Sequence, residues 1–212
     1  MKSVIVGAGT YGEVYLAYLQ ESGIEIVGFL DDNVNLQGTF IKGVPVLGGI
    51  DLLDKIKDIY QIEAVYCPIG NNQLRTHVLT MARNYGLQTP NFIHHTAILA
   101  SNVQIGHGVY VLPNTTIMPY VKIENDVMIS IGSNIAHHSV LRQGVFVSNG
   151  VNLGASLVVE KYSYIGMGST IMTGVKLLGE NCLIGAGAVV IKDVNKNAVM
   201  AGVPAKLLKI KE

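Results

Sequence analysis

Three glycines at a fixed spacing, Gly7-x-Gly9-x-x-Gly12, form the first motif of the chain that could do chemistry. The motif follows a short apolar run and precedes a helical pattern, so it predicts a turn from a strand into a helix. Glycines let the backbone approach a phosphate closely, and the N-terminus of a helix favours an anion. Asp31 and Asp32 follow about 20 residues later, where carboxylates can accept hydrogen bonds from a base or a sugar. This pattern predicts a phosphate- and nucleotide-binding turn.

A second polar group, Gly70-Asn71-Asn72 with Arg75, comes directly after a predicted strand at Ala64–Cys67. Ligands of open α/β sheets bind at the carboxyl ends of the strands. Asn side chains can bind the edge of a base or sugar, and Arg75 can pair with a phosphate. Asn71 or Asn72 can also cap the helix that follows, and the two roles are compatible.

Histidines supply a third group, His137-His138, with a side chain that titrates near neutral pH. Such a side chain can take a proton from an attacking amine or hydroxyl group. A surface histidine at a turn is the plain alternative.

The glycine and asparagine motifs lie in a segment, up to about residue 93, where strand and helix patterns alternate. This alternation predicts a small parallel α/β sheet of about four strands, with a loop at Gly43-Val44-Pro45. The predicted strands are Ser3–Val6, Ile24–Leu30, Ala64–Cys67 and Asn91–Ile93. Three helices are predicted: one follows the glycine motif and ends at Leu19, one lies near Ile50–Ile59, and one extends from about Gln73 to Tyr85.

The histidine pair lies in a segment with a different rule, where an aliphatic residue stands at every sixth position from Leu99 to Ile171. A period of six predicts one short strand and one turn per hexad, stacked as a parallel β-helix of roughly five coils. The first and fifth residues of each hexad face inward, so His137 and His138 lie near a corner, open to solvent or a neighbouring subunit. The register slips by one residue near Lys176-Leu177, and Lys192–Glu212 close the end.

Composition narrows the function classes. The formal net charge is zero and charged residues make up 14%, which disfavours nonspecific nucleic-acid binding. No apolar run approaches the ~18 residues that span a bilayer, and we expect no signal peptide at the start. Cys67 and Cys182 are far apart, which fits a reducing cytoplasm, and neither is expected to be a nucleophile.

Together these features resemble the hexapeptide-repeat (left-handed β-helix) acyltransferases, of the sialic-acid O-acetyltransferase and bacillosamine-pathway N-acetyltransferase type. The stretches that carry the resemblance are VGAGTYG (6–12), FLDDN (29–33), IGNNQLR (69–75), FIHHTAIL (92–99), IMPYVKI (117–123), SNIAHH (133–138) and AGVPAK (201–206). The resemblance implies a nucleotide-sugar-binding α/β domain over residues 1–96 and a left-handed β-helix acyltransferase domain over 97–212. It also implies a homotrimer.

The implied activity is acetyl-CoA-dependent N-acetylation of a nucleotide-linked amino sugar, of the UDP- or dTDP-4-amino-4,6-dideoxy type, for surface glycans and without a metal. His137 aligns with the catalytic base of the family. The implied substrate-binding residues are Gly9, Thr10, Tyr11, Asp31, Asp32, Gly70, Asn71, Asn72 and Arg75. The implied acetyl-CoA-binding residues are Gly154, Ala155, Gly166, Met167, Gly185, Ala186, Gly202 and Lys206, with Lys206 (and Lys209) facing a phosphate of coenzyme A.

The chain departs from the family pattern at two places. Thr10 and Tyr11 stand where the family usually has Gly and His, and His138 stands where it has an acid. An orienting carboxylate would then come from Glu124 or Asp126, one coil earlier or across a subunit interface, or would be absent. A backbone N–H near Gly154-Ala155 is expected to stabilise the oxyanion.

Four other functions remain open from the residues. The glycine motif by itself also suits NAD. Transfer to a hydroxyl of sialic acid or a related sugar would use the same histidine. A β-helix could also bind a nucleotide sugar without catalysis. His94, His95 and His107 could join His137 in a zinc site, as in β-helix hydratases.

Overall fold

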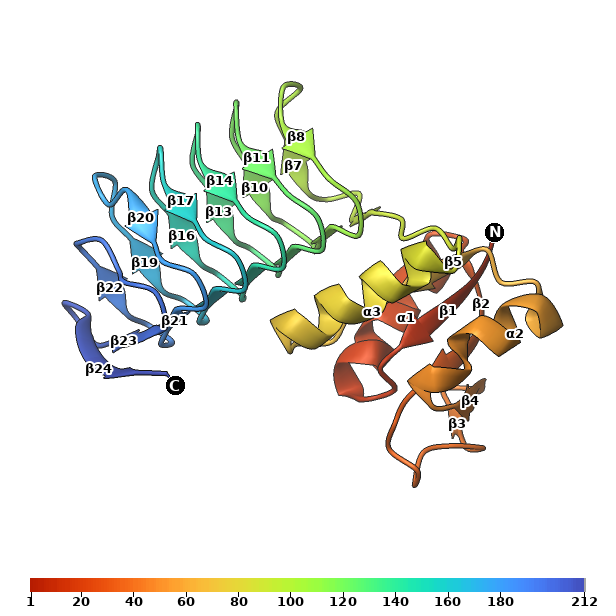
Figure 1. Ribbon diagram of the computed structural model, residues 1–212. Coiled ribbons are helices and arrows are strands. Elements are labelled where there is room, and N and C mark those ends of the chain that lie inside the picture. The colour runs from red at the N-terminus through yellow and green to blue at the C-terminus, as the bar shows by residue number, and fades with distance from the viewer. Residues whose placement is uncertain (212) are drawn as a thin grey trace. The chain divides into compact units, whose positions relative to one another are not determined.

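The computed structural model describes residues 1–211 and divides into two compact units, Met1–Pro90 and Asn91–Glu212 (Figure 1). This division falls earlier than the predicted boundary after residue 96, because the short strand Phe92–Ile93 pairs within the second unit. The strand predicted at Asn91–Ile93 therefore belongs to the β-helix and not to the α/β sheet. Throughout residues 1–211, no helix is long and apolar enough to cross a membrane.

The first unit contains a five-stranded sheet of order β3-β4-β2-β1-β5. Strands β4, β2, β1 and β5 run parallel to one another, and β3 runs antiparallel to β4. The strands are β1 (Lys2–Val6), β2 (Glu25–Leu30), β3 (Phe40–Ile41), β4 (Val44–Gly48) and β5 (Ala64–Tyr66). The helices are α1 (Thr10–Glu21), the 3₁₀ helix η1 (Ile50–Leu52), α2 (Leu53–Tyr60) and α3 (Asn72–Asn84).

The sequence prediction missed β4, which it placed in a loop around Gly43-Val44-Pro45. Val44, Val46 and Gly48 are buried while the residues between them are partly exposed, so this short segment is a half-buried strand. A proline and flanking glycines give the same five residues the composition of a turn. The predicted parallel sheet of about four strands therefore has the right number of parallel strands but one wrong member, and β3 adds an antiparallel fifth strand.

Helices of the first unit bury apolar side chains against the sheet. Leu16 and Leu19 of α1 and Leu79 of α3 are almost fully buried, and Val4 and Val65 lie in the sheet core. Because β1, β2 and β5 are parallel, their carboxyl ends meet at one edge of the sheet. That edge carries the segments that start at Gly7, Asp31 and Cys67.

The second unit is a three-faced parallel β-helix, shown from green to blue in Figure 1. Face 1 contains β6 (Phe92–Ile93), β9 (Tyr110–Val111), β12 (Met128–Ile129), β15 (Phe146–Val147), β18 (Tyr164–Ile165), β21 (Leu183–Ile184) and β23 (Ala198–Ala201), closed by β24 (Lys206–Ile210). Face 2 contains β7 (Ile98–Leu99), β10 (Thr116–Ile117), β13 (Asn134–Ile135), β16 (Asn152–Leu153), β19 (Thr170–Ile171) and β22 (Val189–Val190). Face 3 contains β8 (Gln104–Ile105), β11 (Lys122–Ile123), β14 (Val140–Leu141), β17 (Val158–Val159) and β20 (Leu177–Leu178).

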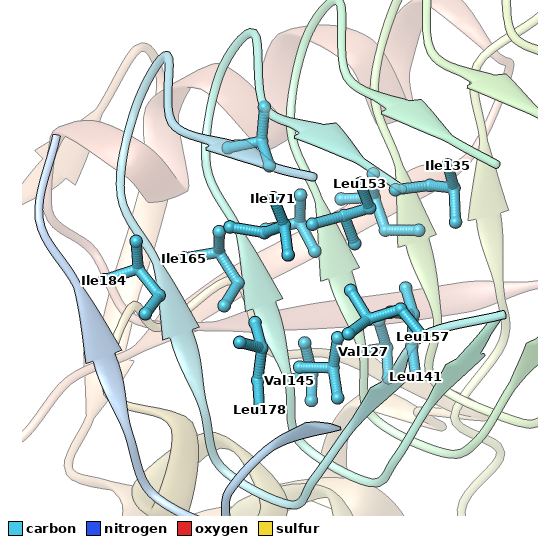
Figure 2. Close-up of a cluster of buried hydrophobic side chains, with 14 of the residues drawn as sticks. Val127, Ile135, Leu141, Val145, Leu153, Leu157, Ile165, Ile171, Leu178 and Ile184 are labelled. Carbon is cyan, nitrogen blue, oxygen red and sulfur yellow. The ribbon is translucent and has the colours of Figure 1, made fainter. Parts of the chain in front are cut away.

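The six-residue period produces this register directly. Ile117 pairs with Ile135, and Ile135 pairs with Leu153, so equivalent residues stack from coil to coil. The first and fifth residues of the hexads fill the interior, as Figure 2 shows for Val127, Ile135 and Leu141 among others. The predicted fold class, a small parallel α/β domain followed by a β-helix, is confirmed.

Turns at the corners connect the faces, and we name each corner by the faces it joins. Corner 2–3 follows the face 2 strands and contains His137 and His138. Corner 1–2 follows the face 1 strands, and corner 3–1 follows the face 3 strands. The extra residue of the register slip lies in the turn between β19 and β20, where Gly174 has φ +108°.

Candidate functional site

A pocket of about 370 Å³ opens at the carboxyl edge of the sheet in the first unit. Its lining combines the glycine turn, the end of β2 and the segment after β5. The lining residues are Gly7, Gly9, Thr10, Tyr11, Gly12, Asp31, Asp32, Ile50, Pro68, Ile69, Gly70 and Leu74. The structure thus brings together most of the predicted substrate-binding residues.

The glycine turn has the shape that its sequence predicts. Gly7 has φ +102°, and a Cβ on Gly12 would collide with the carbonyl oxygen of Gly7. Gly9 is the N-cap of α1 and provides no capping side chain. The first N–H groups of this helix therefore begin at the pocket lining, where they and the helix dipole favour an anion.

The two carboxylates at the pocket have structural partners. Asp31 accepts hydrogen bonds from the Ala8 N–H (2.7 Å) and the Asn33 N–H (2.8 Å). Asp32 is exposed and accepts one from the Ile50 N–H at 2.8 Å. Asp31 thus braces the glycine turn, while Asp32 orders the loop before η1 and presents charge to solvent.

Two of the predicted ligand contacts, those of Arg75 and Asn72, are wrong, because these side chains are buried and bonded to each other. Arg75 is fully buried and donates hydrogen bonds to the Ile69 carbonyl (2.8 Å) and to Asn72 Oδ1 (3.0 Å). Its guanidinium is therefore not available to a phosphate, and the buried Asn72 is its partner. Asn71 caps α3 by accepting a hydrogen bond from the Leu74 N–H at 3.0 Å, which is the alternative role considered for it.

An apolar wall was not anticipated from the sequence. Ile50, Pro68, Ile69 and Leu74 line the pocket beside the glycines. Pro68 and Ile69 follow the parallel strand β5, and that position after a strand is the signal that could have indicated them.

His137 and His138 lie at corner 2–3, and both are exposed. Their Nδ1 atoms are 3.0 Å apart, and the rings are nearly perpendicular at 89°. Tyr120, one coil earlier at the same corner, places its ring centroid 4.7 Å from that of His138. The His138 N–H donates to the Pro119 carbonyl at 3.2 Å, and the His137 carbonyl accepts from the Ser156 N–H at 2.9 Å.

Neither Glu124 nor Asp126 orients His137 within this chain. Both follow β11 of face 3 and so lead to corner 3–1, whereas the residues one coil before the histidines are Pro119 and Tyr120. Glu124 accepts from Arg142 at 2.7 Å, and Asp126 from Gln143 at 3.3 Å. The expectation of an orienting carboxylate from the coil before is therefore wrong.

The predicted acetyl-CoA residues fall on the two corners that flank face 2. Gly166, Met167, Gly185, Ala186 and Gly202 stack along corner 1–2, and Gly154 and Ala155 lie at corner 2–3 beside His137. A Cβ on Gly154 or Gly166 would collide with the backbone of the next coil. Close stacking of coils therefore requires these glycines whether or not a ligand binds. Lys206 is exposed at the start of β24.

The backbone amides near His137 differ in availability. The Gly154 N–H donates to the Ile171 carbonyl at 2.9 Å, so of the Gly154-Ala155 pair this amide is not available to an oxyanion. Within residues 1–211, the neighbouring Ala155 N–H has no hydrogen-bond partner. The Ala155 N–H can therefore donate a hydrogen bond to an oxyanion.

Other reactive side chains are poorly placed for chemistry. Cys67 and Cys182 are buried, and burial raises the pKa of the Cys182 thiol, which disfavours the reactive thiolate. Among the residues that the structure describes, no three His, Cys, Asp or Glu side chains form a group that could hold a metal.

A β-helix built from hexads, joined to an α/β domain with an anion-binding turn, defines a hexapeptide-repeat acyltransferase. Residues 2–82 match the family model described as "PglD N-terminal domain". The chain is similar over both units to hexapeptide-repeat acetyltransferases, the group that the sequence resembles.

Individual relatives agree over both units. GDP-perosamine N-acetyltransferase of Escherichia coli O157:H7 is 28% identical over 188 residues, which are 86% of this chain and 82% of that protein. PerB from Caulobacter crescentus, solved in complex with CoA and GDP-perosamine, has a TM-score of 0.91 and 26% identity over 99% of this chain and 98% of that one. The acetyltransferase domain of PglB from Neisseria gonorrhoeae, solved with acetyl coenzyme A, has a TM-score of 0.89 and 28% identity over 98% of both chains.

Other relatives match over a smaller part. The chain spans 63% of the length of galactoside O-acetyltransferase from Escherichia coli K12, with 28% identity. This match covers less of the chain than the matches to GDP-perosamine N-acetyltransferase and PerB do.

Proposed function

We propose that the protein is an acetyl-CoA-dependent N-acetyltransferase that acts on the amino group of a nucleotide-linked amino sugar. The observation that carries the proposal is the similarity across both units to PerB, which holds CoA and GDP-perosamine. The sequence favoured a UDP- or dTDP-linked sugar. Because two relatives act on or bind GDP-perosamine, a GDP-linked amino sugar is now the first substrate to test.

The nucleotide diphosphate would bind in the pocket of the first unit. The N-terminus of α1 and the turn at Gly9 and Thr10 favour its phosphates, and Asp32 can accept hydrogen bonds from hydroxyl or base N–H groups. Tyr11 and the apolar wall at Ile50 and Ile69 offer surfaces for a flat ring. A site for NAD is built from two nucleotide-binding halves. The first unit contains a single five-stranded sheet, so its fold does not favour NAD as the ligand.

His137 would act as the general base for transfer. As the sugar amine attacks the thioester carbonyl of acetyl-CoA, the amine proton passes to His137 Nε2. The bond between the carbonyl carbon and sulfur then breaks, and coenzyme A leaves with the electron pair. No covalent enzyme intermediate is needed, in keeping with the buried cysteines.

Acetyl-CoA would lie along face 2, between the glycines of corner 1–2 and His137 at corner 2–3. The Ala155 N–H is the donor that would stabilise the oxyanion formed from the thioester. Gly166, Met167, Gly185, Ala186 and Gly202 would border the pantetheine arm, and Lys206 would face a phosphate.

A homotrimer is the assembly that we propose. Exposed apolar side chains gather on face 2 and its two corners: Ile98, Met118, Tyr120, Ile131, Met167, Met172 and Ile191. These side chains can be buried against a second copy of the chain. In a closed cyclic assembly every copy buries them, so this surface is exposed on none of the copies. This packing would bring a neighbouring subunit to the His137 corner.

The proposed substrates suggest a place in the cell and in synthesis. Acetyl-CoA and a nucleotide-linked sugar are cytoplasmic substrates, and a chain with two buried cysteines, far apart in the sequence, fits that compartment. The product would be an N-acetylated sugar nucleotide, which a glycosyltransferase can add to a surface glycan.

Release of free thiol from acetyl-CoA tests the function. The acceptors are GDP-perosamine, UDP- and dTDP-4-amino sugars, free sialic acid and galactosides, each with an acceptor-free control. Release with an amino-sugar nucleotide supports the proposal. Release with a sialic acid or galactoside alone would replace it by O-acetylation, and binding without release by any acceptor would replace it by a non-catalytic sugar-nucleotide scaffold.

A further inference from the structure

We propose that His138 is a positioning residue that holds His137 in the tautomer that a general base requires. The inference rests on the proposed role of His137 as that base. It assigns a function to the residue that stands where the resemblance implies an acid.

The contact between the two rings leaves one proton to share. His137 Nδ1 and His138 Nδ1 are 3.0 Å apart, so one nitrogen donates the proton and the other accepts it. A base that uses Nε2 must carry its own proton on Nδ1. His137 therefore donates from Nδ1 to His138 Nδ1, and His138 carries its proton on Nε2.

The surroundings of His138 keep its ring in place for this contact. Its backbone has φ +60°, and its N–H donates to the Pro119 carbonyl at 3.2 Å. The Tyr120 ring packs against the His138 ring at 4.7 Å with an angle of 38°. A fixed acceptor orients the His137 ring in the way that a carboxylate does in other catalytic sites.

The contact between His137 and His138 also predicts how acid stops the reaction. When His137 takes a proton from the amine, its Nδ1–H still donates to His138, so the contact is kept. When His138 is protonated instead, both of its nitrogens donate, and the contact then requires His137 Nδ1 as acceptor. The proton of His137 moves to Nε2 in that state, and the base is lost.

Few titratable groups face the pair. Tyr120 in the coil before contacts His138, and the coil after offers Ala155 and Ser156 at this corner. Lys122 follows two residues after Tyr120 on face 3. The Glu124 carboxylate is bonded to Arg142 and leads to another corner.

Substitutions at position 138 distinguish the effect of the hydrogen-bond acceptor from the effect of the imidazole ring. Asn and Asp tolerate the positive φ, and their Oδ1 lies at the same point of the side chain as Nδ1 of His. H138A and H138L remove the acceptor, and we expect kcat to fall roughly 10- to 100-fold, part of the ~10²–10⁴-fold that general-base catalysis supplies. We expect H138N and H138D to restore most of kcat, with KM for acetyl-CoA within about twofold throughout.

The pH profile distinguishes positioning from a structural role. The H138D carboxylate favours the imidazolium form of His137, so the acid limb of kcat should move to higher pH than in H138N. N114A is the matched control, since Asn114 is an exposed corner residue with φ +57° on corner 1–2. We expect N114A to keep the wild-type kcat and pH profile.

A measurement without substrate separates this inference from the proposed function. In protein labelled with ¹⁵N-histidine, we expect His137 to be the Nδ1–H tautomer above neutral pH, and to change to the Nε2–H form in H138A. Wild-type His137 as the Nε2–H tautomer, or full activity in H138L, would overturn the inference. If no sugar nucleotide is acetylated by the wild type, the proposed function fails, while the tautomer result still decides the contact.

Discussion

The Asp31 carboxylate accepts a hydrogen bond from the Ala8 N–H at 2.7 Å and so ties the end of β2 to the glycine turn after β1. The second oxygen of Asp31 accepts from the Asn33 N–H and orders the next loop. This arrangement divides the two adjacent acids into different roles. Asp31 shapes the pocket from within, and Asp32 is the one exposed toward a ligand.

Replacing Asp32 tests the nucleotide pocket. We expect D32A to raise KM for the sugar nucleotide about 10-fold, with KM for acetyl-CoA nearly unchanged, because only one ligand loses its acceptor. D32N keeps an oxygen that can accept from the Ile50 N–H, so a similar loss there would exclude loop disorder as the cause. D58A, at an exposed helical acid, is the control. An effect confined to acetyl-CoA would refute the assignment of the pocket.

The glycine turn makes a prediction about stability. A Cβ on Gly12 would collide with the Gly7 carbonyl oxygen, whereas nothing lies within 4 Å of the equivalent position on Gly9. We expect G12A to cost about 1–3 kcal/mol of unfolding free energy, and G9A to cost much less. Urea unfolding of the two variants measures the difference. Equal stability would contradict the geometry of the turn.

Arg75 gives a test between two readings of one residue. If Arg75 bound a phosphate of the substrate, R75A would raise KM for the sugar nucleotide and leave the stability of the protein unchanged. The buried contacts to Ile69 and Asn72 predict the reverse, a loss of at least about 2 kcal/mol in R75A from unsatisfied partners and lost packing. Thermal unfolding without ligand measures this loss. A stable R75A that binds GDP-perosamine poorly would restore the phosphate role.

Sequence predicted the parts that are governed by a period. The hexads determine which side chains face inward, because each coil repeats the same strand and turn, and the structure fills its core with those residues. The same rule could have excluded Glu124, since the residue one coil before His137 is Pro119. The glycine spacing likewise predicted the turn, because Gly12 has no room for a side chain.

Features that depend on the packing of the folded chain could not be predicted from the sequence. Arg75 is bound by a loop carbonyl and a neighbouring amide, and no local pattern distinguishes that burial from a ligand contact. β4 contains Pro45 and ends at Gly48, so only its pairing with β2 reveals it as a strand. The availability of the Ala155 N–H, in contrast to Gly154, depends on which amides the next coil accepts.

His137 carries the prediction for catalysis. We expect H137A to lose about 10²–10⁴-fold in kcat while both ligands bind with nearly unchanged affinity, because His137 is exposed and supports no other coil through its side chain. Isothermal titration with coenzyme A and with GDP-perosamine checks binding, and thiol release checks turnover. Near-normal turnover would remove His137 from the role of base.

The proposed trimer predicts different outcomes for two exposed apolar residues near face 2 and on face 3. Met172, at corner 2–3 directly after the face 2 strand β19, is 48% exposed, and Leu177 on face 3 is 39% exposed. A charge buried in an interface without a partner is costly, so we expect M172E to lower the mass in light scattering from three times 22.7 kDa toward a single chain. L177E, the matched control, should keep the mass of the trimer. If L177E dissociates and M172E does not, then the interface is on face 3, and the proposed packing through face 2 is wrong.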